Sequence, residues 1–202
     1  MFKIKAYKIF LNWLWLPISL LVMLFTCCES DSTIVEKNYS KNNEKLDNDI
    51  FSHSKINNLR IDFLDPNYHE ILVDSFFKKN NYYVAANLYI NEDYFDSVGV
   101  KYKGNSSFIL SYKKTPKVPL SIDLNKFIKH QKKSEISKIR LSNCWTDPTY
   151  MKEVIASSIY DKYLPTPRAS FTNVFIDNQF IGLYNMNEHI NKRFFKKTLW
   201  RK

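Results

Sequence analysis

The sequence predicts one α+β domain with a mainly antiparallel sheet and a few helices. Short segments that alternate between apolar and polar residues recur along the chain, as strands with one buried face do. Polar turn residues join some of these segments, such as Asp177-Asn178 between two strand-like runs. Two other segments carry apolar residues at helical spacing. Strands joined by hairpins, with helices between some of them, are typical of this class.

The first half of the domain is predicted to hold most of the sheet. A helix is expected to begin at Pro66, because proline fits the first helical position. Gly104 to Ser107 should form a loop, since glycine and small polar residues favour turns. Strands are expected over residues 59–64, 82–90, 98–103, 118–124 and 136–141.

The second half begins with a helix that has a clear start signal. Asp147 can accept hydrogen bonds from free backbone N–H groups, and Pro148 suits the first helical position. One side of this helix is expected to face the core, and it carries Met151, Val154, Ile155, Ser158 and Ile159. A hairpin over 169–186 and a basic helix over 190–199 follow.

The N-terminus is predicted to be a lipoprotein signal peptide. Basic residues precede an apolar run from Ile9 to Phe25, which is marginal for a spanning helix of about 20 residues. Leu24-Phe25-Thr26-Cys27 resembles a lipobox, in which the cysteine becomes the first mature residue and carries lipid. A plain signal-anchor helix is the alternative reading of the same segment.

This reading divides the chain into three parts. We expect a signal peptide over 1–26, a polar tether over 27–57 and the folded domain over 58–202. The protein is then exported and lipid-anchored at Cys27, to the bacterial cell membrane or the outer membrane.

The positive charge belongs to the expected domain. Residues 58–202 carry 23 basic and 14 acidic side chains, a net +9 within a chain of +10. Nucleotide phosphate, anionic lipid or an acidic protein could be attracted by this charge, and so could nucleic acid. Nothing resembles a nucleic-acid recognition helix, so no nucleic-acid partner is expected. The alternative interpretation of this charge is a solvated basic surface that binds no specific ligand.

Four segments resemble the CotH (spore coat protein H) kinase-like family. They are VGVKYKGNSSF at 98–108, VPLSIDLNKF at 118–127, NCWTDPTYMKEVIA at 143–156 and LPTPRASFTNVFIDNQFIGLYNMNEHINKRFF at 164–195. The resemblance implies the N-terminal lobe of an atypical protein kinase, which uses ATP with Mg²⁺ or Mn²⁺. It also implies phosphorylation of Ser or Thr in exported proteins.

Two departures from the family pattern limit this expectation. Ser121 stands where family members often carry a cation, and the family's later half, with its catalytic and metal-binding aspartates, does not follow Lys202. We therefore expect a truncated chain that is inactive alone, and name no catalytic or metal-binding residue. A non-catalytic adhesion or binding lipoprotein on the same scaffold is the alternative function.

The candidate phosphate site lies at the end of the 98–103 strand. Lys101 and Lys103 alternate along it and share a face. They lead into Gly104, Asn105 and Ser106, whose backbone N–H groups could approach phosphate oxygens. The alternative is a solvated strand face followed by an ordinary turn.

Two acids complete the predicted ATP site. Glu153 is expected to pair with and orient a phosphate-binding lysine, or else to be a surface acid favoured near a helix start. Glu188 follows the last hairpin strand, where the family resemblance implies contact with adenine. It could equally cap the 190–199 helix.

Overall fold

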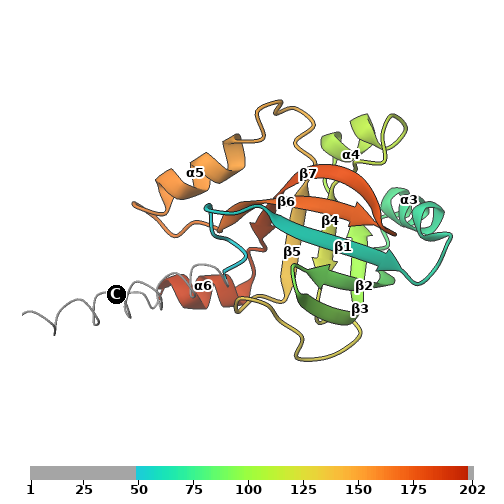
Figure 1. Ribbon diagram of the computed structural model, residues 1–202, viewed down its shortest axis with the longest axis horizontal. Coiled ribbons are helices and arrows are strands. Elements are labelled where there is room, and N and C mark those ends of the chain that lie inside the picture. The colour runs from blue at the N-terminus through green and yellow to red at the C-terminus, as the bar shows by residue number, and fades with distance from the viewer. Residues whose placement is uncertain (1–48, 200–202) are drawn as a thin grey trace, which may run out of the picture. The chain divides into compact units, whose positions relative to one another are not determined.

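The computed structural model describes residues 49–199, in which seven strands form a closed barrel with helices outside it (Figure 1). The strands are β1 (Asn57–Phe63), β2 (Val84–Ile90), β3 (Asp93–Tyr102), β4 (Leu120–Asp123), β5 (Lys138–Ser142), β6 (Ala169–Ile176) and β7 (Gln179–Glu188). The helices are α3 (Tyr68–Lys78), α4 (Ser106–Ser111), α5 (Lys152–Tyr160) and α6 (Lys192–Leu199).

The strand order around the barrel is β1-β2-β3-β4-β5-β7-β6. The seam between β1 and β6 is parallel, with Asn57 opposite Thr172 and Ile61 opposite Ile176. Every other strand pair of the described residues is antiparallel. β5 pairs with β7 and not with β6, the next strand in sequence. Residues of β5 and β7 therefore lie side by side on the outer face of the barrel.

The closed barrel shows that the predicted fold class, an α+β domain resembling a kinase N-terminal lobe, is wrong. The alternating segments did predict strands close to the observed positions. They could not predict closure, because closure depends on the parallel β1–β6 pair. That pair joins segments far apart in sequence, and alternation within a strand says nothing about its partner.

The hydrophobic core fills the barrel. Alternate residues of β2, namely Val84, Ala86, Leu88 and Ile90, are buried, and the residues between them are partly exposed. The same alternation places Ile139 and Leu141 of β5 inside. Side chains at the intervening positions point outward, so the polar residues available for binding lie on the outside of the barrel.

The folded unit begins at Asp49, ahead of the expected boundary at residue 58. Ile50 and Phe51 are buried, and the buried Asn57 donates from Nδ2 to the Ile50 carbonyl at 2.7 Å. The hydrophobic core and all seven strands of the described part belong to the unit Asp49–Lys202. The predicted signal peptide, Cys27 and most of the predicted tether lie outside the described residues.

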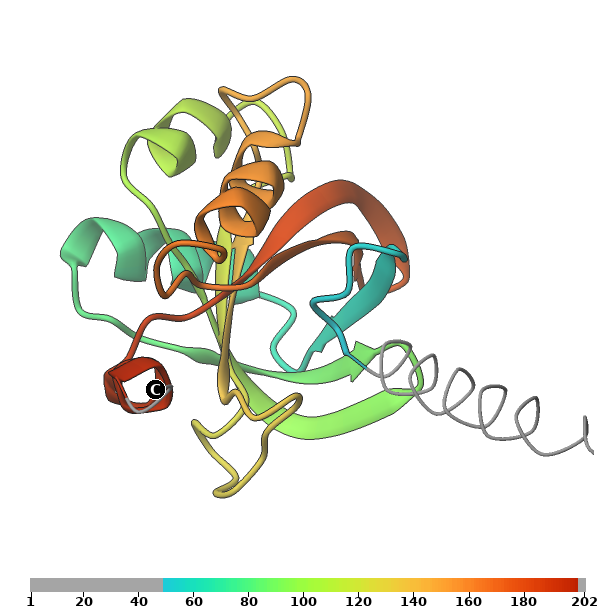
Figure 2. The same cartoon turned by 90° about the vertical axis from the view of Figure 1, so that its left-hand side faces the viewer.

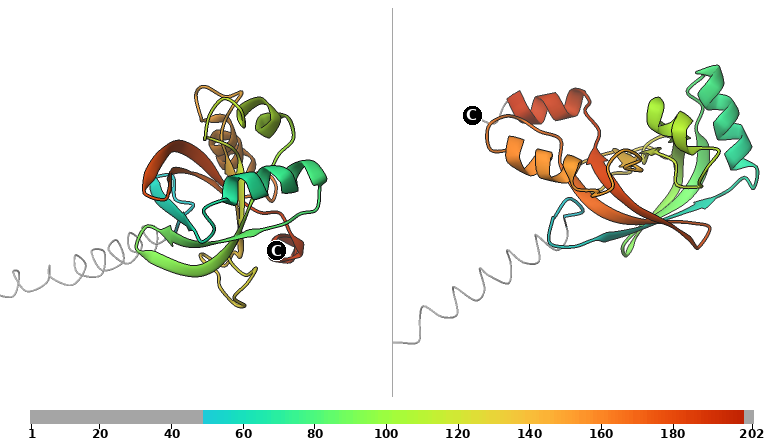
Figure 3. Two further views of the ribbon diagram at one scale, coloured as in Figure 1. Left: turned by 90° about the vertical axis from the view of Figure 1, so that its right-hand side faces the viewer. Right: turned by 90° about the horizontal axis from the view of Figure 1, so that it is seen from above.

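The helices gather at two ends of the barrel. Viewed from above, α3 and α4 lie at one end and α5 and α6 at the other (Figure 3, right). No helix of the part described here is long and apolar enough to span a membrane.

Two helices differ from the expectation. Helix α4 was not predicted, since Ser106 was assigned to a loop. Helix α5 starts at Lys152, and Asp147 accepts the Lys152 N–H at 3.0 Å from the preceding turn. The expected core-facing stripe of α5 is right for Val154, which is buried, but wrong for Met151, Ile155 and Ile159, which are 48%, 43% and 50% exposed. The apolar spacing identified the helix, but Val154 and Ser157 form its buried side.

Candidate functional site

A groove of about 580 Å³ lies between α3, α4 and the end of β3. Its polar wall contains Lys101, Lys103, Gly104 and Asn105, which the sequence had predicted to form a phosphate site. Its apolar wall comes from the two helices and includes Leu72, Phe76, Phe77 and Ile109. The groove therefore combines cationic side chains with a turn of accessible backbone.

Lys101 and Lys103 line the same groove outside the barrel, but they have different surroundings. Lys101 Nζ donates to Asn81 Oδ1 at 2.9 Å and lies 4.8 Å from the centre of the Tyr83 ring. Lys103 Nζ donates to Ser142 Oγ at 3.3 Å. Lys103 therefore reaches across to β5, while Lys101 stays at the rim near the α3–β2 connection.

The turn after β3 depends on Gly104. Its φ of +80° is a conformation that residues with a Cβ rarely adopt, and a Cβ there would lie 2.7 Å from Ser107 Oγ. The backbone N–H groups of Gly104, Asn105 and Ser106 donate no hydrogen bond to another described residue. Ser106 is the first residue of α4, where free N–H groups are expected. The turn can therefore offer donors to an anion.

Glu153 lies near Lys103, but the two side chains do not form an ion pair. Glu153 Oε2 accepts from Asn187 Nδ2 at 2.6 Å, and the same nitrogen lies 3.4 Å from Ser142 Oγ. Within the described residues, Glu153 and Lys103 come no closer than the 4.0 Å of an ion pair. A polar chain therefore runs from Lys103 through Ser142 and Asn187 to Glu153.

The environment of Lys103 disfavours its charge. Burial lowers the pKa of its ammonium below the usual range, and nearby Arg140 lowers it further. Glu153 acts in the opposite direction and partly restores the pKa. A cation held in this way has lost much of its hydration, so an anion in the groove would meet a strongly interacting partner.

Glu188 belongs to a different part of the surface. It is 8% exposed and accepts from Arg168 Nε at 3.0 Å. Arg168 also donates to the Ser134 carbonyl at 3.1 Å and lies 3.5 Å from Asp49. Glu188 borders a cavity of about 430 Å³ beside α6, apart from the groove. The structure thus gathers Lys101, Lys103, Gly104 and Asn105 in one groove. Ser106 and Glu153 do not line that groove, although Glu153 is linked to Lys103 through Asn187 and Ser142, and Glu188 lies elsewhere.

The sequence reasoning missed three residues of this site: Arg140, Ser142 and Asn187. Arg140 lies opposite Asn187 on β7 and opposite Ser121 on β4, so it supplies a cation beside the serine that departs from the family pattern. The alternation of β5 could have shown that Arg140 and Ser142 point outward. No pattern in the sequence indicates that β5 pairs with β7, so the position of Asn187 beside Arg140 and Ser142 could not be predicted.

Neither a reactive thiolate nor a metal-binding cluster is found near the groove among the described residues. Burial raises the pKa of the Cys144 thiol to about 11, so the thiolate form is scarce at neutral pH. Over residues 49–199, no group of three His, Cys, Asp or Glu side chains could hold a metal ion.

The comparisons with known proteins agree with the resemblance in the sequence. The family described as CotH kinase protein matches residues 100–201, a span of half the chain that includes the lysines, the turn, Glu153 and Glu188. The search of curated proteins found no match. On the strength of the family match, the chain belongs to the CotH kinase protein family.

Proposed function

We propose that the groove at the end of β3 binds the phosphates of ATP, for transfer to Ser or Thr hydroxyls of exported proteins. The observation that carries this proposal is the groove itself. It brings Lys101 and Lys103 to the same wall as the turn at Gly104 and Asn105. The family match over residues 100–201 supports the same reading.

The residues have separate roles in this proposal. Lys103 neutralises phosphate charge together with Arg140, which lies on β5 beyond the intervening β4, since both lie on the outer face of the barrel. The free N–H groups around Asn105 donate to phosphate oxygens. Glu153 positions Lys103 through Asn187 and Ser142 rather than by direct pairing.

Mg²⁺ or Mn²⁺ would accompany the nucleotide. The described residues lack a group of three acidic, His or Cys side chains to hold a metal ion, so they do not fit a protein-held metal. No step of the transfer is assigned to them. Their proposed contribution is to bind and orient the triphosphate.

We also propose that the protein is exported and anchored to a membrane through lipid on Cys27. This rests on the charged start, the apolar run and the lipobox-like Leu24-Phe25-Thr26-Cys27, all in the sequence. An exported location is consistent with an acceptor among exported proteins.

Calorimetric titration of ATP into the purified protein tests the nucleotide proposal. We expect saturable binding that weakens for Lys103→Met and is retained for Lys196→Met, since Lys196 lies on α6 outside the groove. Binding that these two substitutions weaken equally would favour the alternative of a non-catalytic binding lipoprotein with a generally basic surface.

A further inference from the structure

The connection between β4 and β5 projects from the barrel as an ordered loop, Leu124–Ser137 (Figure 2). The Leu124 N–H donates to the Ser137 carbonyl at 2.8 Å and closes its base. The His130 N–H donates to Asn125 Oδ1 at 2.7 Å. Gln131 Nε2 donates to the carbonyls of Leu124 and Asp96, at 3.1 and 2.8 Å. These bonds give the loop a defined shape.

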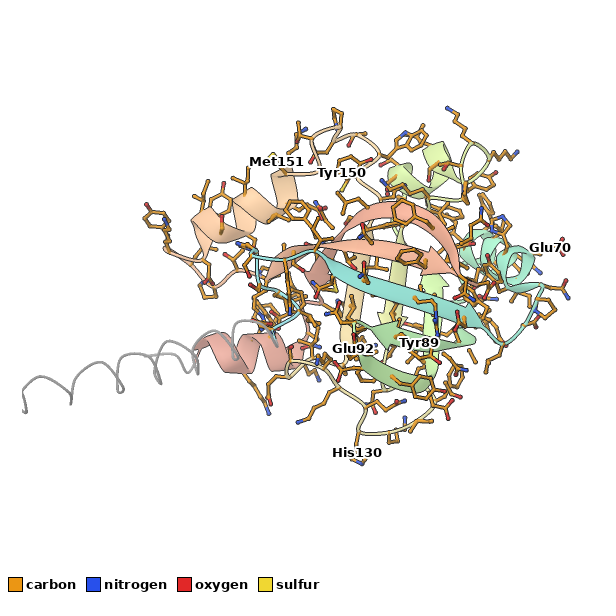
Figure 4. All side chains as sticks on the ribbon, viewed as in Figure 1. Glu70, Tyr89, Glu92, His130, Tyr150 and Met151 are labelled. Atoms are coloured by element: carbon orange, nitrogen blue, oxygen red, sulfur yellow. The ribbon has the colours of Figure 1, made fainter. Side chains whose placement is uncertain are left out.

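Two large apolar side chains of this loop are exposed. Phe127 and Ile128 are 46% and 39% exposed and adjacent in sequence. His130 lies at the outermost part of the loop (Figure 4). Two large apolar side chains exposed together on a hydrogen-bonded projection suggest a contact surface rather than incidental exposure.

Lysines surround this apolar pair. Residues 125–136 carry four Lys and one Glu, a net +3. Lys133 pairs with Asp93, and Lys132 lies 4.0 Å from Glu135. Neither Lys126 nor Lys129 has an acidic partner within the described residues.

The stem of Lys126 is held in place. A Cβ on Gly99 would lie 2.6 Å from Lys126 Cγ, so the lysine stem lies against the glycine backbone. The Lys126 ammonium lies 4.7 Å from the centre of the Tyr83 ring. The loop is therefore braced against the barrel wall by one of its own lysines, and Lys129 remains free to reach outward.

We propose that this loop is a docking surface for an anionic phospholipid bilayer, with Phe127 and Ile128 entering the headgroup region. Aromatic and aliphatic side chains favour the boundary between headgroups and acyl chains. Lysines beside them contact anionic headgroups while their apolar stems stay buried. The charge of the loop complements such a surface, and its exposed apolar pair, Phe127 and Ile128, favours a partner with an apolar layer.

The expected affinity of the loop alone is low. A lysine near an anionic bilayer strengthens binding by about fivefold, and among the described lysines of this loop Lys129 alone has neither an acidic partner nor a ring contact. Such a contact matters for a protein already held at the membrane, because tethering supplies a high effective concentration. The loop would then fix the orientation of the domain, a consequence that rests on the proposed lipid anchor.

Limited trypsin digestion of the full chain, reconstituted in vesicles, tests the proposal. One set is phosphatidylcholine alone, and the other contains about 30% phosphatidylglycerol. We expect cleavage after Lys129 and Lys132 to slow at least about fivefold on the anionic vesicles. Cleavage after Lys114, in the exposed segment that follows α4, should be unchanged.

Variants separate the loop from other surfaces. Phe127→Ser with Ile128→Ser should restore cleavage after Lys132, and so should Lys129→Glu. The matched control is Ile109→Ser with Leu110→Ser on α4, whose side chains are 54% and 43% exposed. These substitutions are at exposed positions, and thermal unfolding will show that each variant stays folded.

Three results would overturn the proposal. One is equal cleavage on both vesicles, and another is protection that is lost in the α4 control instead of the loop variants. The third is equal protection by soluble polyglutamate, which would identify an acidic protein as the partner. Flotation of the chain with neutral vesicles, measured first, tests the anchor separately, so failure of the anchor and failure of the loop are distinguishable.

Discussion

Replacing Lys103 with methionine gives the most direct test of the phosphate groove. Methionine keeps a long apolar stem but removes the ammonium that donates to Ser142 Oγ at 3.3 Å. A charge-assisted hydrogen bond to phosphate contributes about 1.5–3 kcal/mol, so ATP affinity should fall roughly ten- to a hundredfold. Lys101 should contribute less to ATP binding, because its hydrogen bond to Asn81 is exposed to solvent, whereas that of Lys103 to Ser142 is partly buried. For Lys101→Met we expect a loss of about fivefold, the value of a solvated charge pair.

The assay is calorimetric titration with ATP at low and moderate salt. Lys113→Met is a matched control, because Lys113 is an exposed lysine outside the groove. Glu153→Gln should weaken binding less than Lys103→Met, and the two changes should be less than additive, because Asn187 and Ser142 link the two side chains. Equal losses for Lys103→Met and Lys113→Met, or strictly additive effects of Lys103 and Glu153, would refute the reasoning.

The same lysine predicts a dependence of stability on pH. The pKa of Lys103 is lowered in the folded protein, so the unfolded chain binds more protons between the two pKa values. The free energy of unfolding should therefore rise as pH increases through the folded pKa toward the unfolded value. Lys103→Met should be more stable than wild type at neutral pH and should lack this contribution to the alkaline rise. Urea unfolding at neutral and alkaline pH would show it, and an unchanged rise would contradict the assignment.

Three further predictions concern the turn, the buried ion pair and the anchor. Gly104→Ala should lower the free energy of unfolding by about 1 kcal/mol and weaken ATP binding, because its φ of +80° disfavours a side chain. A fully stable variant would contradict this. Arg168→Met should cost about 3 kcal/mol, measured by urea unfolding, because it leaves the 8% exposed Glu188 carboxylate without its partner. Adding Glu188→Leu should restore most of that loss. Cys27→Ala should leave an uncleaved, slower-migrating precursor that no longer enters the detergent phase, whereas unchanged processing would exclude the lipoprotein reading.

Local features of the fold could be predicted from the sequence. The hairpin of β6 and β7 turns at Asp177 and Asn178, whose positive φ values of 46° and 66° suit this short connection. The shared face of Lys101 and Lys103 also followed from alternation alone. These features depend on residues within a few positions of each other.

The remaining features depend on contacts between distant segments. Ser142 and Asn187 meet because β5 lies beside β7, and no local pattern specifies that neighbour. The prediction that Ile155 and Ile159 of α5 face the core was wrong for a similar reason, because it too depends on a contact between distant segments. Ile155 and Ile159 reveal a helix by their spacing, but only the position of the barrel decides which side is buried.

The parallel seam between β1 and β6 has a consequence for the order of folding. The first strand of the barrel pairs with residues 172–176, so the ring cannot close until the distant C-terminal hairpin is present. Pairing over such a separation makes folding slow, because a long loop must be ordered first. Until then, β1 has one unpaired edge that can recruit other chains. A polypeptide that crosses a membrane unfolded would thus stay open until its last hairpin has been translocated, which suits the proposed export.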